Sequence, residues 1–336
     1  MTKEFSGAAI AVRLGRSRII GILGTCALLC APMTPQEAAA QDKFPSKPIE
    51  VVTHAGVGGG TDITARMMMV HAPGEFKTEF VVVNRTGGSG AAAFQYAAGQ
   101  PRDGHTILLI TQTHLLTIMR GKSPVKYEDL VPLARATDDP QILMVGKASP
   151  FKSAKDWLQA GKDKPVRYGI TQVASVDHIA VVRVADKAKH QKPNLVPFKG
   201  GGDVVINLVG GNIEAALLNY AEAESQLKAG DVRALAIFAD KRLAALPDVP
   251  TSKEIGLADT HSTVRGFVTL KGAPEATNKA LEEGLVKAMK GQLFQTYLNT
   301  SGQSLDSVVG STGWKAQLDD FMTEGKKALE TLGLLK

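Results

Sequence analysis

The chain has 336 residues, of which 44% are hydrophobic, 21% are charged and 5% are aromatic. These values are ordinary for a soluble globular protein with room for two domains, and they exclude a membrane channel and a disordered chain. The formal net charge of +6 is mild and evenly spread. Together with the few aromatic side chains, it argues against a nucleic-acid-binding protein.

The first forty residues have the pattern of a secretory signal peptide. Arg13, Arg16 and Arg18 precede an apolar stretch, "IIGILGTCALLCAPM", and small residues then lead to a cleavage site after Ala40. The apolar stretch is shorter than the roughly 20 residues of a membrane-spanning helix, so we favour a cleaved leader over an anchor. The sequence therefore predicts a periplasmic protein.

Both cysteines, Cys26 and Cys30, lie inside this leader. The mature chain would then have no disulfide, no thiol nucleophile and no cysteine-ligated metal. Without the leader the chain keeps 35 basic and 31 acidic residues, which leaves a net charge of +4.

After the leader, apolar stretches of strand and helix type alternate along the chain. Strands followed repeatedly by helices predict an α/β fold of the doubly wound class, with mostly parallel sheets flanked by helices. Strands are predicted at 49–55, 79–85, 105–113, 141–147, 166–173, 193–198, 213–220, 232–239 and 265–272, and helices at 62–72, 89–100, 175–188, 204–211, 274–291 and 313–335.

In the predicted helix 62–72, Ile63, Met67 and Val70 would lie on one helical face. The C-terminal helices are expected to pack back on the first sheet. This arrangement predicts a discontinuous first domain, residues 41–138 and 264–336, and an inserted second domain, residues 139–263, with a ligand cleft between them.

Two glycine-rich loops each follow a strand and open a helix: "GVGGGTD" at residues 56–62 and "RTGGSGA" at residues 85–91. Glycines free the backbone to aim its N–H groups at one point, and the helix behind adds unpaired donors and a partial positive charge. Neighbouring loops of this kind meet at one end of a sheet. We therefore expect a shared carboxylate site, with Asp62 orienting the first loop.

Nucleotide binding and catalysis fit these loops poorly. Thr61 stands where a dinucleotide fingerprint needs a glycine, and "GKS" at residues 121–123 lacks the upstream glycine of a phosphate loop. Around Ser89, Ala91 replaces the last glycine of a nucleophile elbow. The seven histidines show no metal-ligand spacing, so no metal and no cofactor are expected.

An ordered set of motifs resembles the Bug family, the periplasmic solute-binding receptors of tripartite tricarboxylate transporters. The motifs are "FPSKPIEVV", "GGGTDITAR", "NRTGGSGAAA", "DGHTILL", "VPFKGG", "LVGGNIEAAL", "LKAGDVRALAI" and "ALPDVPTSKEIG", and the resemblance covers residues 44–336. It implies a two-lobed, class II-like periplasmic binding fold that closes on a small organic carboxylate without chemistry.

The resemblance also implies which positions contact the ligand. In the family the two loops hold a carboxylate through backbone groups and waters, and later segments meet the rest of the ligand. The matching positions are Gly58, Gly59, Gly60, Thr61, Asp62, Thr86, Gly87, Gly88, Ser89, Thr111, Thr113, His114, Ser175, His178, Lys199, Gly200, Asn219 and Tyr220.

The chain departs from the family pattern at three places. The first loop has one residue more, no proline, and His54 near its start; Thr86 replaces a proline in the second loop; and Asp177 stands where a neutral residue is frequent. Asp177 either caps a helix or meets a cation or hydroxyl at the far end of the ligand, and capping is favoured. His178 either lines the cleft or acts as a cap.

The sequence thus predicts a receptor, not an enzyme, that delivers a mono- or dicarboxylate to the permease subunits of a tripartite transporter. Two alternatives remain open: a partner that presents its ligand to a sensor histidine kinase, and a hydrolase that uses Ser89. The identity of the acid and the oligomeric state stay open as well.

Overall fold

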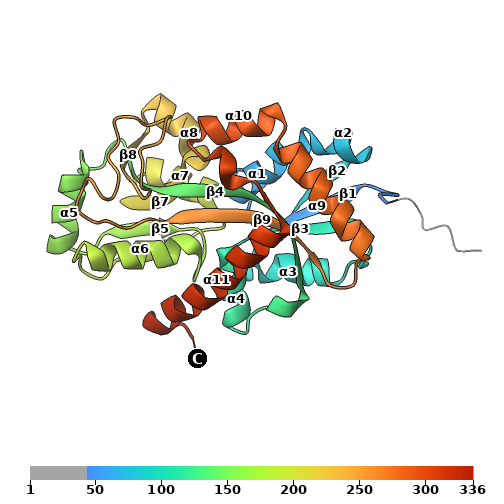
Figure 1. The fold of residues 1–336 in the computed structure, drawn as a ribbon. Coiled ribbons are helices and arrows are strands. Elements are labelled where there is room, and N and C mark those ends of the chain that lie inside the picture. The colour runs from blue at the N-terminus through green and yellow to red at the C-terminus, as the bar shows by residue number, and fades with distance from the viewer. Residues whose placement is uncertain (1–43, 336) are drawn as a thin grey trace, which may run out of the picture. The chain divides into compact units, whose positions relative to one another are not determined.

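The computed structural model describes residues 44–335 of the chain. The predicted signal peptide, residues 1–40, lies outside the described residues. Ten strands form a sheet with the order β2-β1-β3-β9-β4-β7-β5-β6, and β8 and β10 both pair with β4 (Figure 1). The strands are β1 (Ile49–Thr53), β2 (Phe80–Asn84), β3 (Thr106–Thr111), β4 (Leu130–Gly146), β5 (Arg167–Ile170), β6 (Asn194–Pro197), β7 (Ala215–Asn219), β8 (Val232–Ile237), β9 (Ser262–Leu270) and β10 (Val309–Gly310).

Helices connect and cover these strands. The α-helices are α1 (Gly60–Met69), α2 (Ala72–Phe76), α3 (Ala91–Ala98), α4 (Gln112–Met119), α5 (Ala154–Asp163), α6 (Val176–Lys187), α7 (Gly201–Val209), α8 (Tyr220–Ala229), α9 (Glu275–Met289), α10 (Gln292–Thr300) and α11 (Ser311–Thr331); three 3₁₀ turns are η1 (Gly88–Gly90), η2 (Tyr127–Asp129) and η3 (Leu305–Ser307).

The parallel strands form two groups, as the alternation of strands and helices predicts. β1 lies between β2 and β3 in parallel register, and β5 lies between β6 and β7 in the same way. We call the first group, with α1–α4 and α9–α11, lobe 1, and the second group, with β8 and α5–α8, lobe 2. Two long antiparallel strands, β4 and β9, join the two groups.

The first half of β4 was not predicted from the sequence. It contains Pro132, Asp138, Asp139 and Pro140, which disfavour a strand locally. Pairing with β9 over its length overrides that preference, with irregular register around Pro132 and around Arg135. The predicted domain boundaries fall inside these two strands, where Asp138 pairs with Val264; the division at those residues stays a prediction.

Apolar residues fill both faces of the sheet. In β1, Val51 packs into a cluster with α1, α9 and α10, while the next residue, Val52, packs into a cluster with α3, α4 and α11. In β4, Leu143 and Ile142 point to opposite clusters of lobe 2 in the same way. Successive side chains of each strand therefore point to opposite faces of the sheet, and helices cover both faces. This agrees with the predicted fold class. It also confirms that the C-terminal helices pack back on the first sheet.

The face of the first helix that bears Ile63, Met67 and Val70 is only partly covered by the core. Thr64, Ala65 and Met68 are the fully buried residues in its middle and last turn, and Val70 is 55% exposed. Ile63 and Met67 pack against the edge of the same cluster. The helix begins at Gly60 and ends at Met69, so Val70 lies beyond the stretch that the core covers.

None of the helices between residues 44 and 335 combines the length and the apolar character that crossing a bilayer requires.

At the contact between β9 and α11, Gly266 leaves no room for a side chain unless its neighbour shifts. An added Cβ would lie 2.4 Å from the ring of Trp314, which is fully buried. We expect Gly266→Ala to lower the free energy of unfolding, measured by urea denaturation, by about 1–3 kcal/mol because the ring must shift. The control Gly74→Ala, on α2 in open space, should change it by less than about 1 kcal/mol. Equal effects of the two substitutions would contradict this packing.

Candidate functional site

A small cavity lies where the two lobes meet, at the carboxyl ends of β1, β3, β5 and β7. This is the position at which α/β sheets bind ligands. Its volume is about 40 Å³, enough for one or two water molecules, so the lobes must part to admit a larger ligand. The cavity is lined by His54, Ala55, Gly59, Thr61, Thr111, Thr113, Gln141, Thr171, Gln172, Val176, Asp177, Lys199, Gly200, Gly201, Leu217, Asn219, Glu222, Thr263 and Arg265.

The first glycine loop lies on this cavity and folds around Asp62. The N–H of Gly58, a residue with φ of +78°, donates to Asp62 Oδ2 over 3.0 Å. Asp62 also accepts hydrogen bonds from Arg66 and Asn84. Burial alone would raise the pKa of Asp62, but these hydrogen bonds outweigh burial and lower the pKa. Asp62 therefore orients the loop, as the sequence predicts, and Gly59 and Thr61 line the cavity.

The second glycine loop reaches the opposite lobe instead of the cavity. Thr86, Gly87 and Gly88 are exposed. Ser89, at φ of +55°, donates from Oγ to the carbonyl oxygen of Val173 over 2.7 Å. The two loops follow the neighbouring parallel strands β1 and β2, but residues 86–89 of the second loop do not line the cavity. The Ser89 hydroxyl donates to a backbone carbonyl.

The segment after β3 supplies hydroxyl groups to the cavity. Thr111 caps α4, since its Oγ1 accepts from the N–H of Thr113, and Thr113 Oγ1 accepts from the N–H of Val176 in lobe 2 over 3.3 Å. His114 lies behind the cavity, with Nδ1 accepting from the N–H of Thr111 and the ring edge-on to His54 at 4.3 Å.

The two histidines are held neutral. Burial, helped by the charge of Arg265, lowers the pKa of His54 to about 4. Burial and the neighbouring His54 lower the pKa of His114 well below its ordinary value. Neither ring supplies positive charge to an anion near neutral pH.

In lobe 2 the predicted residues divide between the cavity and the scaffold. Lys199, Gly200 and Asn219 line the cavity. Ser175 caps α6, and His178 accepts the N–H of Ala174 at Nδ1 over 2.8 Å. Tyr220 is buried in the apolar cluster beneath α7 and α8.

Asp177 lies on the cavity but already has partners. Its carboxylate accepts hydrogen bonds from the backbone N–H and the hydroxyl of Thr171. Burial raises the pKa of Asp177 although these hydrogen bonds act in the opposite direction. The bonds tie the end of β5 to the first turn of α6. The cap of α6 that was expected of Asp177 is provided by Ser175 instead.

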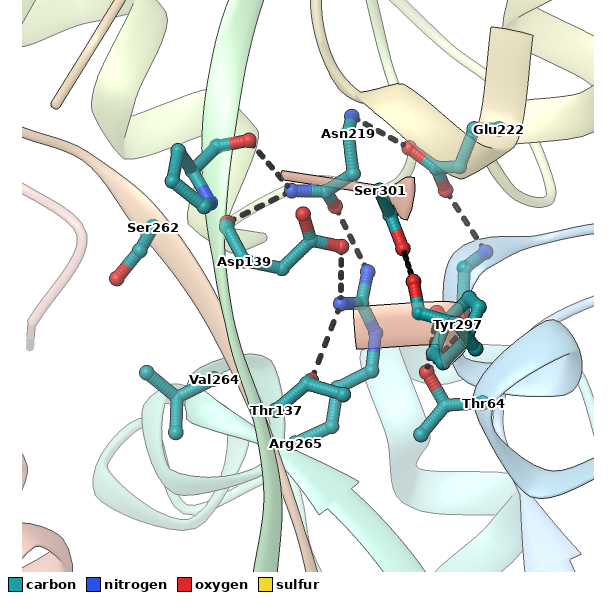
Figure 2. Close-up of polar contacts among 12 residues, drawn as sticks. Thr64, Thr137, Asp139, Asn219, Glu222, Ser262, Val264, Arg265, Tyr297 and Ser301 are labelled. Atoms are coloured by element: carbon teal, nitrogen blue, oxygen red, sulfur yellow. Dashed lines mark hydrogen bonds and ion pairs between the residues drawn. The ribbon is translucent and has the colours of Figure 1, made fainter. Parts of the chain in front are cut away.

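A buried arginine at the centre of the site was missed by the sequence reasoning. Arg265, on β9, is 1% exposed. Its Nη1 donates to Asp139 Oδ2 over 2.8 Å and its Nη2 donates to Asn219 Oδ1 over 2.7 Å (Figure 2). Thr137 lies 3.4 Å from Nη1. The available signal was a single charged residue at the start of the apolar stretch "RGFVTL".

Burial of this ion pair costs free energy, and removal of either partner costs free energy as well. Burial raises the pKa of Asp139 to about 7, against the opposing charge of Arg265. Removing one partner of such a pair costs about 3–5 kcal/mol because the other charge stays buried. Arg265 therefore joins β9, β4 and β7 at the point where the lobes meet.

Several buried polar atoms on the cavity have no hydrogen-bond partner among residues 44–335: His54 Nδ1, Gln141 Oε1, Gln172 Oε1 and Arg265 Nε. Buried polar groups without partners are uncommon, and they mark places where water or a ligand can bind. Within the same described part of the chain, no group of histidine, cysteine, aspartate or glutamate side chains is arranged to hold a metal ion.

The lowered pKa of His54 predicts a pH dependence of folding. The unfolded chain binds a proton at His54 near pH 6.5, whereas the folded chain does so only near pH 4, so His54 costs stability as the pH falls through this window. At pH 4.5 the cost reaches about 2–3 kcal/mol. Urea denaturation at pH 7.5 and 4.5 should show that His54→Gln loses less stability than the parent chain by about this amount. Equal losses would contradict the neutral, buried state of His54.

Comparison with known proteins agrees with this architecture. The family described as "Tripartite tricarboxylate transporter family receptor" matches residues 65–330. Protein BugT of Bordetella pertussis is 28% identical over 244 residues, covering 71% of this chain and 73% of BugT. The crystal structure of a TctC solute-binding protein from Polaromonas is 27% identical with a TM-score of 0.63, covering 86% of this chain and 99% of that protein.

A second solved structure, described as that of a periplasmic transporter, is 26% identical with a TM-score of 0.81 and covers 87% of this chain and 99% of that one. The fold is thus that of the two-lobed periplasmic binding proteins. By the match over residues 65–330, the chain belongs to the receptor family of the tripartite tricarboxylate transporters.

Proposed function

We propose that the chain is a periplasmic receptor that captures a small organic carboxylate between its lobes and delivers it to the membrane permease of a tripartite transporter. One observation carries the proposal: the cavity lies at the strand ends of both lobes, beside the start of α1, and is lined by Arg265 and Lys199. The family assignment and the leader-like first forty residues support transport and export. Binding without chemistry is part of the proposal.

The lobes meet through hydrogen bonds that closure would form and opening would break. Ser89 binds the carbonyl of Val173, Thr113 accepts from the N–H of Val176, and the N–H of Gly60 donates to Glu222. A few bonds of roughly 1 kcal/mol each can favour closure while permitting opening. Ligand binding would add contacts that only the closed form provides, which shifts the population toward that form.

Within this proposal the ligand meets the first glycine loop and the threonine hydroxyls. Gly59 and Thr61 lie on the cavity with Thr111 and Thr113, opposite Lys199, Gly200 and Asn219. The lobe boundaries, residues 41–138 and 264–336 against 139–263, belong to the same proposal. The predicted ligand-binding positions that do not line the cavity are part of this proposal too. Their role in it is to hold the loops that carry the lining residues.

Thr61 offers a direct test because it is 4% exposed, lines the cavity and forms no side-chain hydrogen bond within residues 44–335. The small acid that co-purifies with the protein would first be identified by native mass spectrometry and removed. A hydrogen bond to a charged group contributes about 1.5–3 kcal/mol, so Thr61→Val should weaken binding of that acid about tenfold or more in calorimetric titration.

The matched control is Thr296→Val, since Thr296 lies exposed on α10. It should bind the acid as the parent chain does. If no acid co-purifies and no carboxylate of a broad panel binds the parent chain, the proposed function is wrong.

A further inference from the structure

The carboxylate of Glu222 lies where helix N-termini from both lobes converge. Oε1 accepts the N–H of Gly60, the first residue of α1, over 2.9 Å. Oε2 accepts the N–H of Asn219, the N-cap of α8, over 3.1 Å. An added Cβ at Gly201, the first residue of α7, would lie only 2.1 Å from Oε1. Three helices of nine or ten residues thus begin around one side-chain carboxylate.

This convergence has the chemistry of an anion site. Helix N-termini present unpaired N–H donors and a partial positive charge, which favour a carboxylate. Arg265 adds a full charge nearby, since an added Cβ at Gly60 would lie 2.2 Å from its Nη2 and 3.2 Å from Glu222 Oε1. The backbone at Gly60 lies close to Arg265, and the backbone at Gly201 lies close to Glu222. A side chain at either glycine would collide with that neighbour.

Carboxyl groups already crowd the cavity beside Glu222, and burial raises the pKa of Glu222 itself although Arg265 and the N–H groups of Asn219 and Gly60 oppose that shift. Asp177 also lines it, and Asp139 lies next to it in the pair with Arg265. The cations on the cavity are the buried Arg265, already paired with Asp139, and the exposed Lys199. A second ligand carboxylate would face like charges at short range.

The remaining polar groups on the cavity are neutral. They include the hydroxyls of four threonines, the amides of Gln141, Gln172 and Asn219, and the imidazole of His54; the threonines are Thr61, Thr111, Thr113 and Thr171, and Thr263 adds a fifth hydroxyl. The amide oxygens of Gln141 and Gln172 are buried without a partner among the described residues. They fit a ligand end that bears hydroxyl, amide or other neutral polar groups.

We propose that Glu222 takes the place of one ligand carboxylate, so that this receptor selects acids with a single carboxylate over dicarboxylates of the same length. The inference rests on the proposed function and narrows its ligand class. The single carboxylate of the ligand would lie toward Thr61 and Lys199, and its neutral end toward Gln141 and Gln172.

Calorimetric titration with matched pairs of acids tests the inference on the purified protein, after co-purified ligand has been removed. The pairs are 4-hydroxybutanoate and succinate, 6-hydroxyhexanoate and adipate, and 4-hydroxybenzoate and terephthalate, so that each monocarboxylate carries a neutral polar group where its partner carries the second carboxylate. The parent chain should bind the monocarboxylate of at least one pair tenfold or more tighter than its dicarboxylate. Glu222→Gln keeps an acceptor oxygen and the side-chain size but removes the charge, and should reduce that preference at least tenfold by improving dicarboxylate binding.

The matched control is Glu224→Gln on the same helix, where Glu224 pairs with Lys228 at the surface; it should keep the parent preference. A parent chain that binds dicarboxylates as tightly as monocarboxylates would overturn the inference while leaving the receptor function intact, and this comparison does not depend on the folding of any variant. An unchanged preference in folded Glu222→Gln would also overturn it. Failure of every acid of this panel and of the broader one to bind the parent chain would instead remove the proposed function.

Discussion

The buried pair of Arg265 and Asp139 is the interaction on which the organisation of the site depends. Both side chains are almost fully buried, and Asn219 completes the set by accepting from Arg265 and donating to the carbonyl of Asp139. Charges are buried only when they are paired and hydrogen-bonded. Three strands from distant parts of the sequence must therefore meet in one arrangement, and that arrangement sets where the lobes meet.

Three glycines around the site are required by close contacts with neighbouring side chains. Gly60 must lack a side chain because Arg265 lies over it, Gly201 because Glu222 lies over it, and Gly90 because the ring of His114 lies 2.7 Å from where its Cβ would be. The glycine loops thus serve close contact between parts of the protein as well as access to backbone N–H groups. Glycines that permit close contact and glycines that expose backbone N–H groups produce the same glycine-rich pattern in the sequence.

The order of nine strands and six helices could be predicted because it depends on local periodicity and glycine punctuation. The helices α2, α4, α5, α8 and α10 and the short strand β10 were not predicted, and α4 begins within the predicted strand 105–113. The first half of β4 could not be predicted, since its prolines and aspartates take strand form only through pairing with β9. At the site, Thr61, Thr113 and Asn219 follow strands or open helices, where motifs identify them, and they line the cavity. Arg265 and Glu222 belong to no motif, and only tertiary packing brings them there. The second loop follows β2 beside the first loop, but its Ser89 bonds to Val173 of lobe 2 and residues 86–89 do not line the cavity.

The most direct measurement is a crystal structure of the protein with the acid that co-purifies with it. We expect the acid in the cavity between the lobes, with its carboxylate near Thr61 and Lys199 and with Glu222 still bound to the N–H of Gly60. An acid whose carboxylate replaces Glu222 at Gly60 would contradict the role of Glu222. An acid bound elsewhere, such as the groove between α4, α6 and α11, would contradict the assignment of the site itself.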